Sequence, residues 1–455
     1  MPGLTSTMLM ATQALLADQG ALQVTSNNIA NANTPGYTRE TAVLTEGSPT
    51  IEGNLTFGSG VTLDKIQSIR DQLLELRISE ENQQQGNAQA QVNSLQQVQG
   101  IFADPTQGIG ADLTTFFDSL SQLSTNPANI PQRQAVLTAA QNVANSFHQT
   151  SSNLTTIQSS LNQTVTQTVD QINTLTQQIA QLNGQVSTMQ KLGQEPGVLL
   201  DQETALIQQV SQLTDVSEIQ TESGLTLTTS GGAALVVGNQ SFNLQAAVNT
   251  AGQYQVSAQG QDITSAIQGG KLGGTLQIRD QVIPGLLNQL DTLASQFATA
   301  FNTAQASGFD LNGNAGQPFF SATAGVGAAN SFSVLITDPN LIAASSDGSA
   351  GSNGNIAQLT AVQSQPLPSG TNPMDSYANL VFNVGNLTSQ AQAEESASSS
   401  SLNQLNDQLG AVSGVSIDEE TANLLVYQRA FESAARVVTT VDQLTQTVLT
   451  MGSLT

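Results

Sequence analysis

The sequence predicts a mainly α-helical protein with an inserted β domain. We expect a long, coiled-coil-like helical bundle made from both ends of the chain and a β-rich outer domain made from its middle. Apolar residues recur at steps of three and four toward both ends, and the period changes to two in the middle. Aromatic residues make up only 4% of the 455 residues, which favours thin helical seams over thick globular layers.

The first 40 residues predict an amphipathic helix with an abrupt end. Between Leu4 and Ile29 the inward positions step alternately by four and three, as in a heptad repeat. Asp18 is the only charged side chain before Arg39. A helix so poor in charge has little face suited to water, so we expect partners to cover most of it. The segment "NTPG" at 33–36 then ends the helix.

Residues 41–214 predict an extended segment followed by a long helical bundle. The clearest repeat runs from Leu154 to Met189, where ten apolar steps cover 35 residues, an average of 3.5. That period is typical of a left-handed coiled coil. The other elements expected here are an extended stretch to residue 64, a helix over 66–102, a break at "DPTQGIG" from Asp104, and helical segments over 113–123 and 135–147.

The second half of the chain returns from β to helix. Alternating β-branched residues between Gly and Asn turns, as in "LTLTTSGGAALVVGNQSFNLQ", predict a β-rich outer domain over 215–270. The remaining predicted parts are a bundle helix over 271–307, a loop- and β-rich insertion of the outer domain over 308–375, a bundle helix over 376–414, and a C-terminal assembly helix over 415–455 that pairs with 1–40.

Composition excludes several classes of partner. The net charge is −24, from 34 acidic and 10 basic residues, so binding to nucleic acid or to an anionic membrane is not expected. No run of 18 apolar residues predicts a membrane span. The start, "MPGLTSTMLMATQALLADQG", lacks the basic region and cleavage site of a secretory leader. If the protein leaves the cytoplasm, we expect a route without a cleaved signal peptide.

No motif predicts catalysis, a cofactor or a metal site. The chain has no cysteine and one histidine, His148, which we expect to be structural at the end of a helix. "DLNGNAG", from Asp310, resembles the start of a calcium loop but lacks its glycine at position 6 and its final glutamate, so it predicts a polar turn. The acid pair Glu419–Glu420 fits the first turn of a helix, capped by Ser416 or Asp418, better than acid–base chemistry.

Two terminal segments resemble the signatures of the bacterial flagellar rod, hook and hook-associated proteins. One is "TSNNIANANTPGYTRE", from Thr25, and the other is "GVSIDEETANLLVYQRAFESAARVVTTVDQLTQTVL", from Gly414. Internal segments such as "IFADPTQGIGADLTTFFDSLSQLSTNP" and "LLDQETALIQQVSQLTDV" resemble the hook-associated members in particular. The likeness covers most of the chain and thins out between about 325 and 375. From the residues alone, the Asn-rich stretch could equally be a subunit interface or an ordinary helix end.

The resemblance implies a structural subunit without cofactor that polymerises at the junction of hook and filament. The implied partners are copies of itself, hook protein, the second junction protein, and an export chaperone on the C-terminal helical region. The implied location is the extracellular flagellum, reached through the flagellar type III channel, with terminal helices that order on assembly. The resemblance also implies these assembly-interface residues: Asn28, Ile29, Asn31, Asn33, Thr34, Pro35, Gly36, Tyr37, Asp418, Glu419, Glu420, Asn423, Leu424, Tyr427, Gln428, Phe431 and Ala435.

Three alternatives stay open at this point. A rod or hook subunit would share the ends of the chain but lack the internal helical segments. A type III-secreted coiled-coil effector would need an apolar helical hairpin, which the sequence does not contain. An enzyme in the β domain would have to use Glu218, Glu222 and Asp262 without any Lys, Arg or His nearby.

Overall fold

The computed structural model describes residues 2–52, 55–102, 106–221, 224–250, 253–321 and 323–452. The predicted break at Asp104 and the candidate acid Glu222 lie outside the described residues. The chain forms two compact units. We call Met1–Gln83, Gln171–Leu244 and Ser398–Thr455 the terminal unit, and Gln84–Asp170 with Gln245–Ala397 the middle unit.

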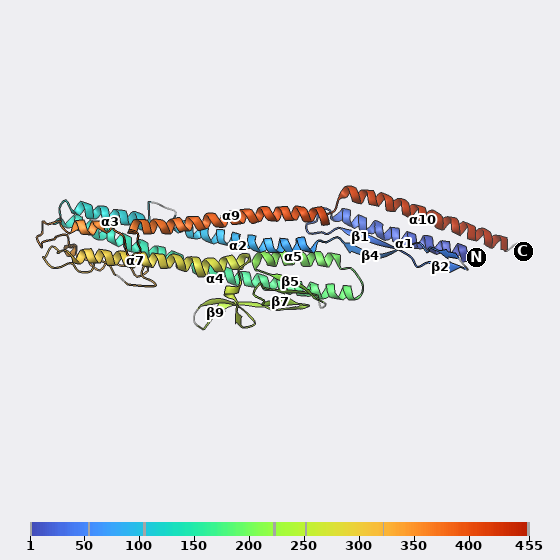
Figure 1. Ribbon diagram of the computed structural model, residues 1–455, viewed down its shortest axis with the longest axis horizontal. Helices are drawn as coiled ribbons and strands as arrows, with labels where there is room; N and C mark the ends of the chain where they lie inside the picture. Colours follow the sequence, from blue (N-terminus) through green and yellow to red (C-terminus); the bar gives the residue numbers. More distant parts are fainter. Residues whose placement is uncertain are drawn as a thin grey trace. The chain divides into compact units, whose positions relative to one another are not determined.

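In the terminal unit, the first and last helices lie side by side and run in opposite directions (Figure 1). They are α1, Pro2–Asn31, and α10, Ile417–Gly452. The heptad positions predicted on α1 are buried or half-buried, and Val441 of α10 is buried as well. The two ends of the chain therefore form one helical pair, as the predicted fold class implied.

A β-hairpin follows α1. Strand β1, Glu40–Glu46, pairs antiparallel with β4, Val61–Ser68, and a second hairpin joins β2, Thr50–Glu52, to β3, Leu55–Phe57. The helix expected from residue 66 was placed too early, because β4 continues through Ser68. The helix α2 is Gln72–Phe102. Asp71 caps it by accepting hydrogen bonds from the backbone N–H groups of Leu73 and Leu74, both at 3.1 Å.

The bundle helix α4, Ile130–Lys191, joins the two helical segments predicted over 135–147 and 154–189 into one. The polar stretch between them contains no Pro or Gly to end the helix, and its hydroxyl groups bond within it. Thr155 and Thr156 donate to the carbonyls four residues earlier, both at 2.9 Å. His148 therefore lies inside a helix rather than at its end; it is exposed, and its Nδ1 lies 3.0 Å from the carbonyl oxygen of Asn330.

The β-rich segment contains two small sheets. In the terminal unit, a four-stranded antiparallel sheet follows α5, Gly197–Leu213. Its strands are β5 Ser217–Thr221, β6 Gly224–Thr228, β7 Ala234–Val237 and β8 Gln240–Ser241. A three-stranded sheet contains β9 Leu244–Val248, β10 Tyr254–Ala258 and β11 Gln261–Asp262, nearly all in the middle unit. Among the described residues no hydrogen-bonded ladder joins the two sheets, and the bounds of the expected β-rich outer domain over 215–270 stay a prediction.

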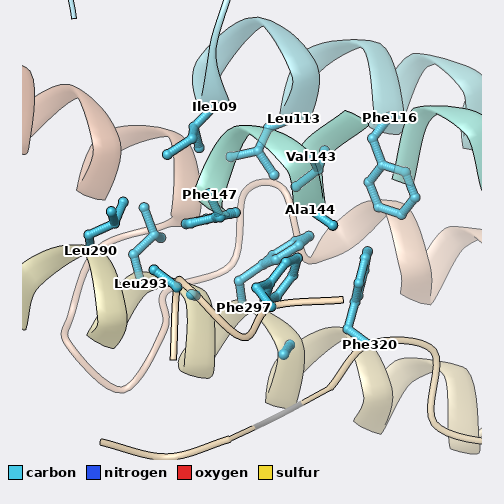
Figure 2. Close-up of a cluster of buried hydrophobic side chains, with 14 of the residues drawn as sticks. Ile109, Leu113, Phe116, Val143, Ala144, Phe147, Leu290, Leu293, Phe297 and Phe320 are labelled. Carbon is cyan, nitrogen blue, oxygen red and sulfur yellow. The ribbon is translucent and has the colours of Figure 1, made fainter. Parts of the chain in front are cut away.

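The middle unit has a core rich in phenylalanine, between α3, Ile109–Leu123, α4 and α7, Ile283–Ala306 (Figure 2). The helix expected over 271–307 consists of α6, Gly270–Gln277, a π-helical turn, Ile278–Val282, and α7. The rings of Phe116 and Phe301 have centroids 5.1 Å apart at 54°, a tilted arrangement that aromatic pairs favour. The first part of α9, Pro373–Ser413, also packs against this core.

Residues 308–375 belong to this core, not to a β-rich outer domain as expected. Phe319 and Phe320 are fully buried, with ring centroids 4.8 Å apart. The side-chain amide of Asn302 on α7 accepts from both of their backbone N–H groups, at 2.8 and 2.9 Å. The physical reason is that large apolar side chains in a loop-rich segment need a core to cover them. The regular elements here are a 3₁₀ turn, Pro339–Leu341, and α8, Ile356–Ala361.

Candidate assembly site

Helix α1 lies against α10 on one face and against the β1–β4 hairpin on another. The small residues Ala17 and Ala21 are fully buried, which lets these elements approach closely. At Gly20, an added Cβ would lie 2.6 Å from Cδ2 of Leu63. At Gly60, which has φ +85°, it would lie 2.8 Å from Cγ of Met10. Glycine is therefore needed at position 60, whereas a larger residue at position 20 would require the end of the Leu63 side chain to move.

Asn28 fastens the end of α1 to the start of β1. Its side chain donates to the carbonyl of Glu40 at 2.7 Å and accepts from the Glu40 N–H at 3.0 Å, as a neighbouring strand would. The hydroxyl of Tyr37 donates to the same Asn28 oxygen at 2.9 Å. Asn28 is 1% exposed. Its amide thus satisfies backbone groups that would otherwise be buried without partners.

The turn after α1 is built by the other residues of the Asn-rich stretch. Asn31 donates to the carbonyl and side-chain oxygens of Asn27, both at 3.0 Å, and Thr34 donates to Asn31 at 3.2 Å. Gly36 has φ +78°, a conformation that favours glycine. The chain reverses here and brings Tyr37 back over α1. The "NTPGY" segment is therefore a defined turn.

Arg39 links this N-terminal region to the start of α10. Its Nε lies 2.8 Å from Glu420 and its Nη1 lies 2.8 Å from Glu419. The side chain of Glu420 is 3% exposed, whereas that of Glu419 is 62% exposed. The backbone N–H of Arg39 also donates to the carbonyl of Ser413 at 2.9 Å. We call Arg39, Glu419 and Glu420 the terminal clamp, in which the buried pair with Glu420 dominates because solvent screens Glu419.

A second ionic group lies next to the clamp along the chain. Arg70 pairs with Asp201 of α5, and its Nη1 lies 3.2 Å from Glu75 of α2. Asp201 in turn accepts from the backbone N–H of Thr38 at 3.1 Å, one residue before Arg39. Asp201 therefore connects α5 both to Arg70 and to the chain between the turn and the clamp.

The carboxylates around Tyr37 act on its phenol. Burial, together with the charges of Glu40, Asp201 and Glu420, raises the pKa of Tyr37 to about 12. Burial and the charge of Asp201 also raise the pKa of Glu40, partly offset by a hydrogen bond from Asn27. The Tyr37 hydroxyl therefore keeps its proton at any physiological pH and remains a donor to Asn28.

Apolar side chains remain exposed on the outer faces of this pair. On α1, Leu9 and Leu16 are 60% and 63% exposed and lie one heptad apart. On α10, the residues spaced by eleven, seven, four and three share one face, and we call them the α10 outer stripe: Val426, Val437, Leu444, Val448 and Met451. Apolar side chains that are exposed along one face of a helix favour an interaction with another apolar surface.

The predicted interface residues differ in their exposure to solvent. Asn28 and Glu420 are buried within the chain, where Asn28 holds the turn and Glu420 pairs with Arg39; their place at a subunit interface stays a prediction. The half-buried residues are Ile29, Asn31, Tyr37, Asn423, Leu424, Tyr427, Phe431 and Ala435. The exposed ones are Asn33, Thr34, Pro35, Gly36, Asp418, Glu419 and Gln428.

Sequence reasoning missed Arg39, Arg70 and Asp201. A signal was available for Arg39, which is one of only ten basic residues and directly follows the "NTPGYT" motif. The acid pair Glu419–Glu420 was assigned to the helix dipole alone, and its ion pairing was not foreseen. Ser416 does cap α10, because its hydroxyl lies 3.5 Å from the Glu419 N–H and its carbonyl accepts from the Glu420 N–H at 2.9 Å.

The described residues contain no group of three or more His, Cys, Asp or Glu side chains that could hold a metal ion. In the calcium-like loop, the side-chain carboxylate of Asp310 accepts hydrogen bonds from the backbone N–H groups of Asn312 and Asn314, both at 2.8 Å. In the part of the chain that the structure describes, no helix has the length and apolar character to cross a bilayer.

Protein-family models match both ends of the chain. A model described as "Flagella basal body rod protein" matches residues 8–38, and one described as "Flagellar basal body rod FlgEFG protein C-terminal" matches residues 410–451. These spans contain the turn after α1, most of α1, and nearly all of α10. Together with the paired helices and the clamp, they define the class of the protein as an axial subunit of the bacterial flagellum.

The residues between the two ends identify the family within this class. A model described as "Flagellar hook-associated protein FlgK helical domain" matches residues 95–320. Flagellar hook-associated protein 1 of Bacillus subtilis (strain 168) is 30% identical, with 96% of each chain covered. Its namesake in Escherichia coli (strain K12) is 27% identical, covering 95% of this chain and 97% of that one. The chain belongs to the flagellar hook-associated protein 1 family and is a structural subunit of the flagellum.

A solved structure supports the fold. The flagellar hook junction protein FlgK from Burkholderia pseudomallei matches with a TM-score of 0.66 at 19% identity, covering 74% of this chain and 100% of that one. At this identity the likeness concerns the fold alone. It fits a mainly helical chain with long terminal helices and small antiparallel sheets between them.

Proposed function

We propose that the protein polymerises at the junction of hook and filament and adapts one to the other. The observation that carries this proposal is the terminal helical pair. Within the chain, Asn28 bonds to the start of β1 and the terminal clamp joins Arg39 to α10. On the outer faces of the pair, Leu9, Leu16 and the α10 outer stripe remain exposed. A helical pair whose internal polar contacts are satisfied and whose outer faces expose apolar side chains is suited to packing against further subunits.

The family and the neighbouring fold support the location. The Burkholderia protein is named a flagellar hook junction protein. We infer that copies of this chain lie side by side in a ring or helical layer, with hook protein on one side and the second junction protein on the other. The exposed residues of the turn, from Asn33 to Gly36, are the predicted contacts at the N-terminal end.

The same surface argues for protection before assembly. The side chains of Val426 and Met451 are 63% and 67% exposed, and such surface promotes unwanted association in a free subunit. We propose that an export chaperone covers the C-terminal helical region and that the protein leaves through the flagellar type III channel without a cleaved signal peptide. Its final location would then be extracellular.

We further propose that the terminal helices gain their full order on assembly. The terminal pair buries mainly small residues such as Ala17 and Ala21, which contribute less apolar area than large ones. Docking onto neighbouring subunits would bury the exposed leucines and valines and supply the missing stabilisation.

Limited proteolysis with mass mapping tests this coupling on the full-length protein, free and after mixing with preformed hooks. A protease of broad specificity is required, because no Lys or Arg precedes Arg39. We expect cleavage before about residue 40 and after about residue 415 in the free protein, and protection on hooks. Terminal helices that resist the protease in the free protein would contradict ordering on assembly. The location at the junction is tested separately, by labelling the protein on intact flagella.

A further inference from the structure

One loop of the middle unit, residues 324–331, holds an apolar side chain out in solvent. Val326 is 97% exposed and lies between Gly325 and Gly327, whose φ angles are +93° and +85°. A backbone with these angles favours glycine, so the two glycines fix the shape of the tip that carries the valine. We call residues 324–331 the valine loop.

Hydrogen bonds attach the valine loop to the helices. The buried carboxylate of Asp291 on α7 accepts from the backbone N–H groups of Gly327 and Ala329, both at 2.8 Å. On α4, Nδ1 of His148 lies 3.0 Å from the carbonyl oxygen of Asn330. A lone exposed valine needs no explanation by itself. On a loop that is already held in place, however, a partner can bury it with little further loss of conformational entropy.

A pocket of about 360 Å³ lies in the same unit, between α7 and residues 358–368. Pockets that bind small ligands measure roughly 300–1,000 Å³, so this one is ample for a single side chain. We call it the α7 pocket. The apolar half of its lining consists of Ala300, Ala304, Val362, Pro366, Leu367 and Pro368.

The polar half of the lining is uncharged and largely engaged within the chain. The hydroxyls of Thr299 and Thr303 donate to carbonyls four residues earlier, both at 2.8 Å, and that of Ser307 donates to the Ala304 carbonyl at 2.7 Å. Three glutamines complete the lining, and no charged side chain belongs to it among the described residues. Because its hydroxyl donors are already used, the α7 pocket is suited to an apolar occupant.

The valine loop and the α7 pocket lie on opposite sides of α7. Asp291, which binds the loop, and Ala300, which lines the pocket, are nine residues apart. At 3.6 residues per turn this separation is two and a half turns, so the two side chains point in opposite directions. The exposure of Val326 shows that the pocket of its own chain does not hold it. A contact between two different patches of identical chains continues from copy to copy, in a ring or a helical array.

We propose that Val326 of one subunit inserts into the α7 pocket of the next, so that the middle units of neighbouring copies join head to tail. The valine loop and the lining of the pocket both lack charged residues. Chains with a net charge of −24 repel one another, and an uncharged contact lets two copies meet without bringing like charges together. The inference rests on the proposed polymerisation of the chain and not on its place at the junction.

Disulfide cross-linking of the full-length protein tests the contact, because the chain has no cysteine of its own. The double variant Val326→Cys, Thr303→Cys changes two exposed positions. After binding to preformed hooks and oxidation, we expect a ladder of linked multimers on a non-reducing gel, and no ladder from either single variant. Val326→Cys combined with Gln289→Cys is the matched control. Gln289 is exposed on the same side of α7 but about 21 Å along the helix from Thr303, so it should give no ladder.

Cosedimentation with hooks separates this contact from the proposed function. A double variant that binds hooks but forms no ladder would overturn the head-to-tail contact alone, whereas a wild type that does not bind hooks would contradict the proposed function and the contact with it. Val326→Ser should raise the protein concentration needed to cover the hooks about tenfold, since one buried apolar side chain is lost. Leu335→Ser, which changes another exposed apolar residue of the middle unit, should not. Equal effects of these two variants would also overturn the proposal.

Discussion

The core of the middle unit and the terminal helical pair use the same helical periodicity but very different side chains. Among the described residues, the middle core buries nine phenylalanines: Phe102, Phe116, Phe117, Phe147, Phe297, Phe301, Phe319, Phe320 and Phe332. Figure 2 shows Phe116, Phe147, Phe297 and Phe320 within it. The pair of α1 and α10 is packed around alanines and polar residues such as Asp18 and Thr25. A heptad repeat therefore indicates where helices meet but not how much area they bury.

The terminal pair exposes more large apolar side chains than the middle unit does. On α10 the side chains of Leu425 and Leu449 are 49% and 60% exposed, in addition to the α10 outer stripe. Among the described residues, the middle unit exposes fewer large apolar side chains, of which Val326, Leu335 and Phe382 are 97%, 54% and 75% exposed. The comparison teaches that the middle unit is stabilised by a large apolar core, whereas the terminal pair depends on a few specific polar contacts and leaves apolar side chains exposed.

The largest effect should come from the middle core. Phe297 is fully buried and its ring lies 5.4 Å from that of Phe320, so Phe297→Ala leaves a large cavity. We expect a loss of about 3–5 kcal/mol in the free energy of unfolding, measured by urea denaturation. Phe382→Ala is the control, since Phe382 is 75% exposed, and should change stability by less than about 0.5 kcal/mol. Equal losses in the two variants would break the comparison.

A smaller but more local effect is expected at the end of α1. Asn28→Ala leaves the N–H and carbonyl of Glu40 and the hydroxyl of Tyr37 without their partner. Each unsatisfied buried group costs about 1–3 kcal/mol, so we expect a loss of about 2–3 kcal/mol after relaxation, confined to α1 and β1. Exchange protection of residues 20–46 measures it. Asn33→Ala, at an exposed position, should be silent; loss of protection there as well would mean that the whole turn is structural.

The terminal clamp should contribute somewhat less. Arg39→Gln leaves Glu420 buried without its charged partner, and we expect a loss of about 2 kcal/mol, below the cost for a fully buried pair because Arg39 is 18% exposed. The free energy of opening at the start of α10, from hydrogen exchange, is the measurement. Lys65→Gln breaks the exposed pair with Glu195, at 3.7 Å, and should cost less than about 0.5 kcal/mol. Similar costs would show that the clamp is an ordinary surface pair.

Most of the helices could be predicted from local sequence patterns. The heptad steps of α1 and α10 and the "NTPG" stop could be predicted because periodicity and turn chemistry act over a few residues. The terminal clamp could not, since Arg39 and Glu420 are 381 residues apart and meet only once two helices have a fixed register. The same holds for Arg70 and Asp201, which are 131 residues apart.

The insertion at 308–375 shows a different limit. Its Gly, Ser and Asn content hides any period, so it was assigned to the outer domain. Yet Phe319, Phe320 and Phe332 are large apolar residues in a chain with little aromatic content, and their presence indicated a core segment. Likewise, Asn28 was singled out as an interface residue, but the sequence could not say that its amide faces inward, because burial depends on the hairpin that folds over it.

The smallest effect on stability should accompany a large effect on assembly. Leu444→Ser changes an α10 outer stripe residue that is 49% exposed, so the isolated protein should lose less than about 0.5 kcal/mol. If the outer stripe is covered by neighbouring subunits, the same change places a hydroxyl in a dry contact and weakens binding to preformed hooks, measured by cosedimentation. Gln443→Ser, at the adjacent exposed position, should leave binding unchanged. Should Leu444→Ser bind as wild type, the terminal pair would be complete in itself and the contrast with the middle core would concern side-chain size alone.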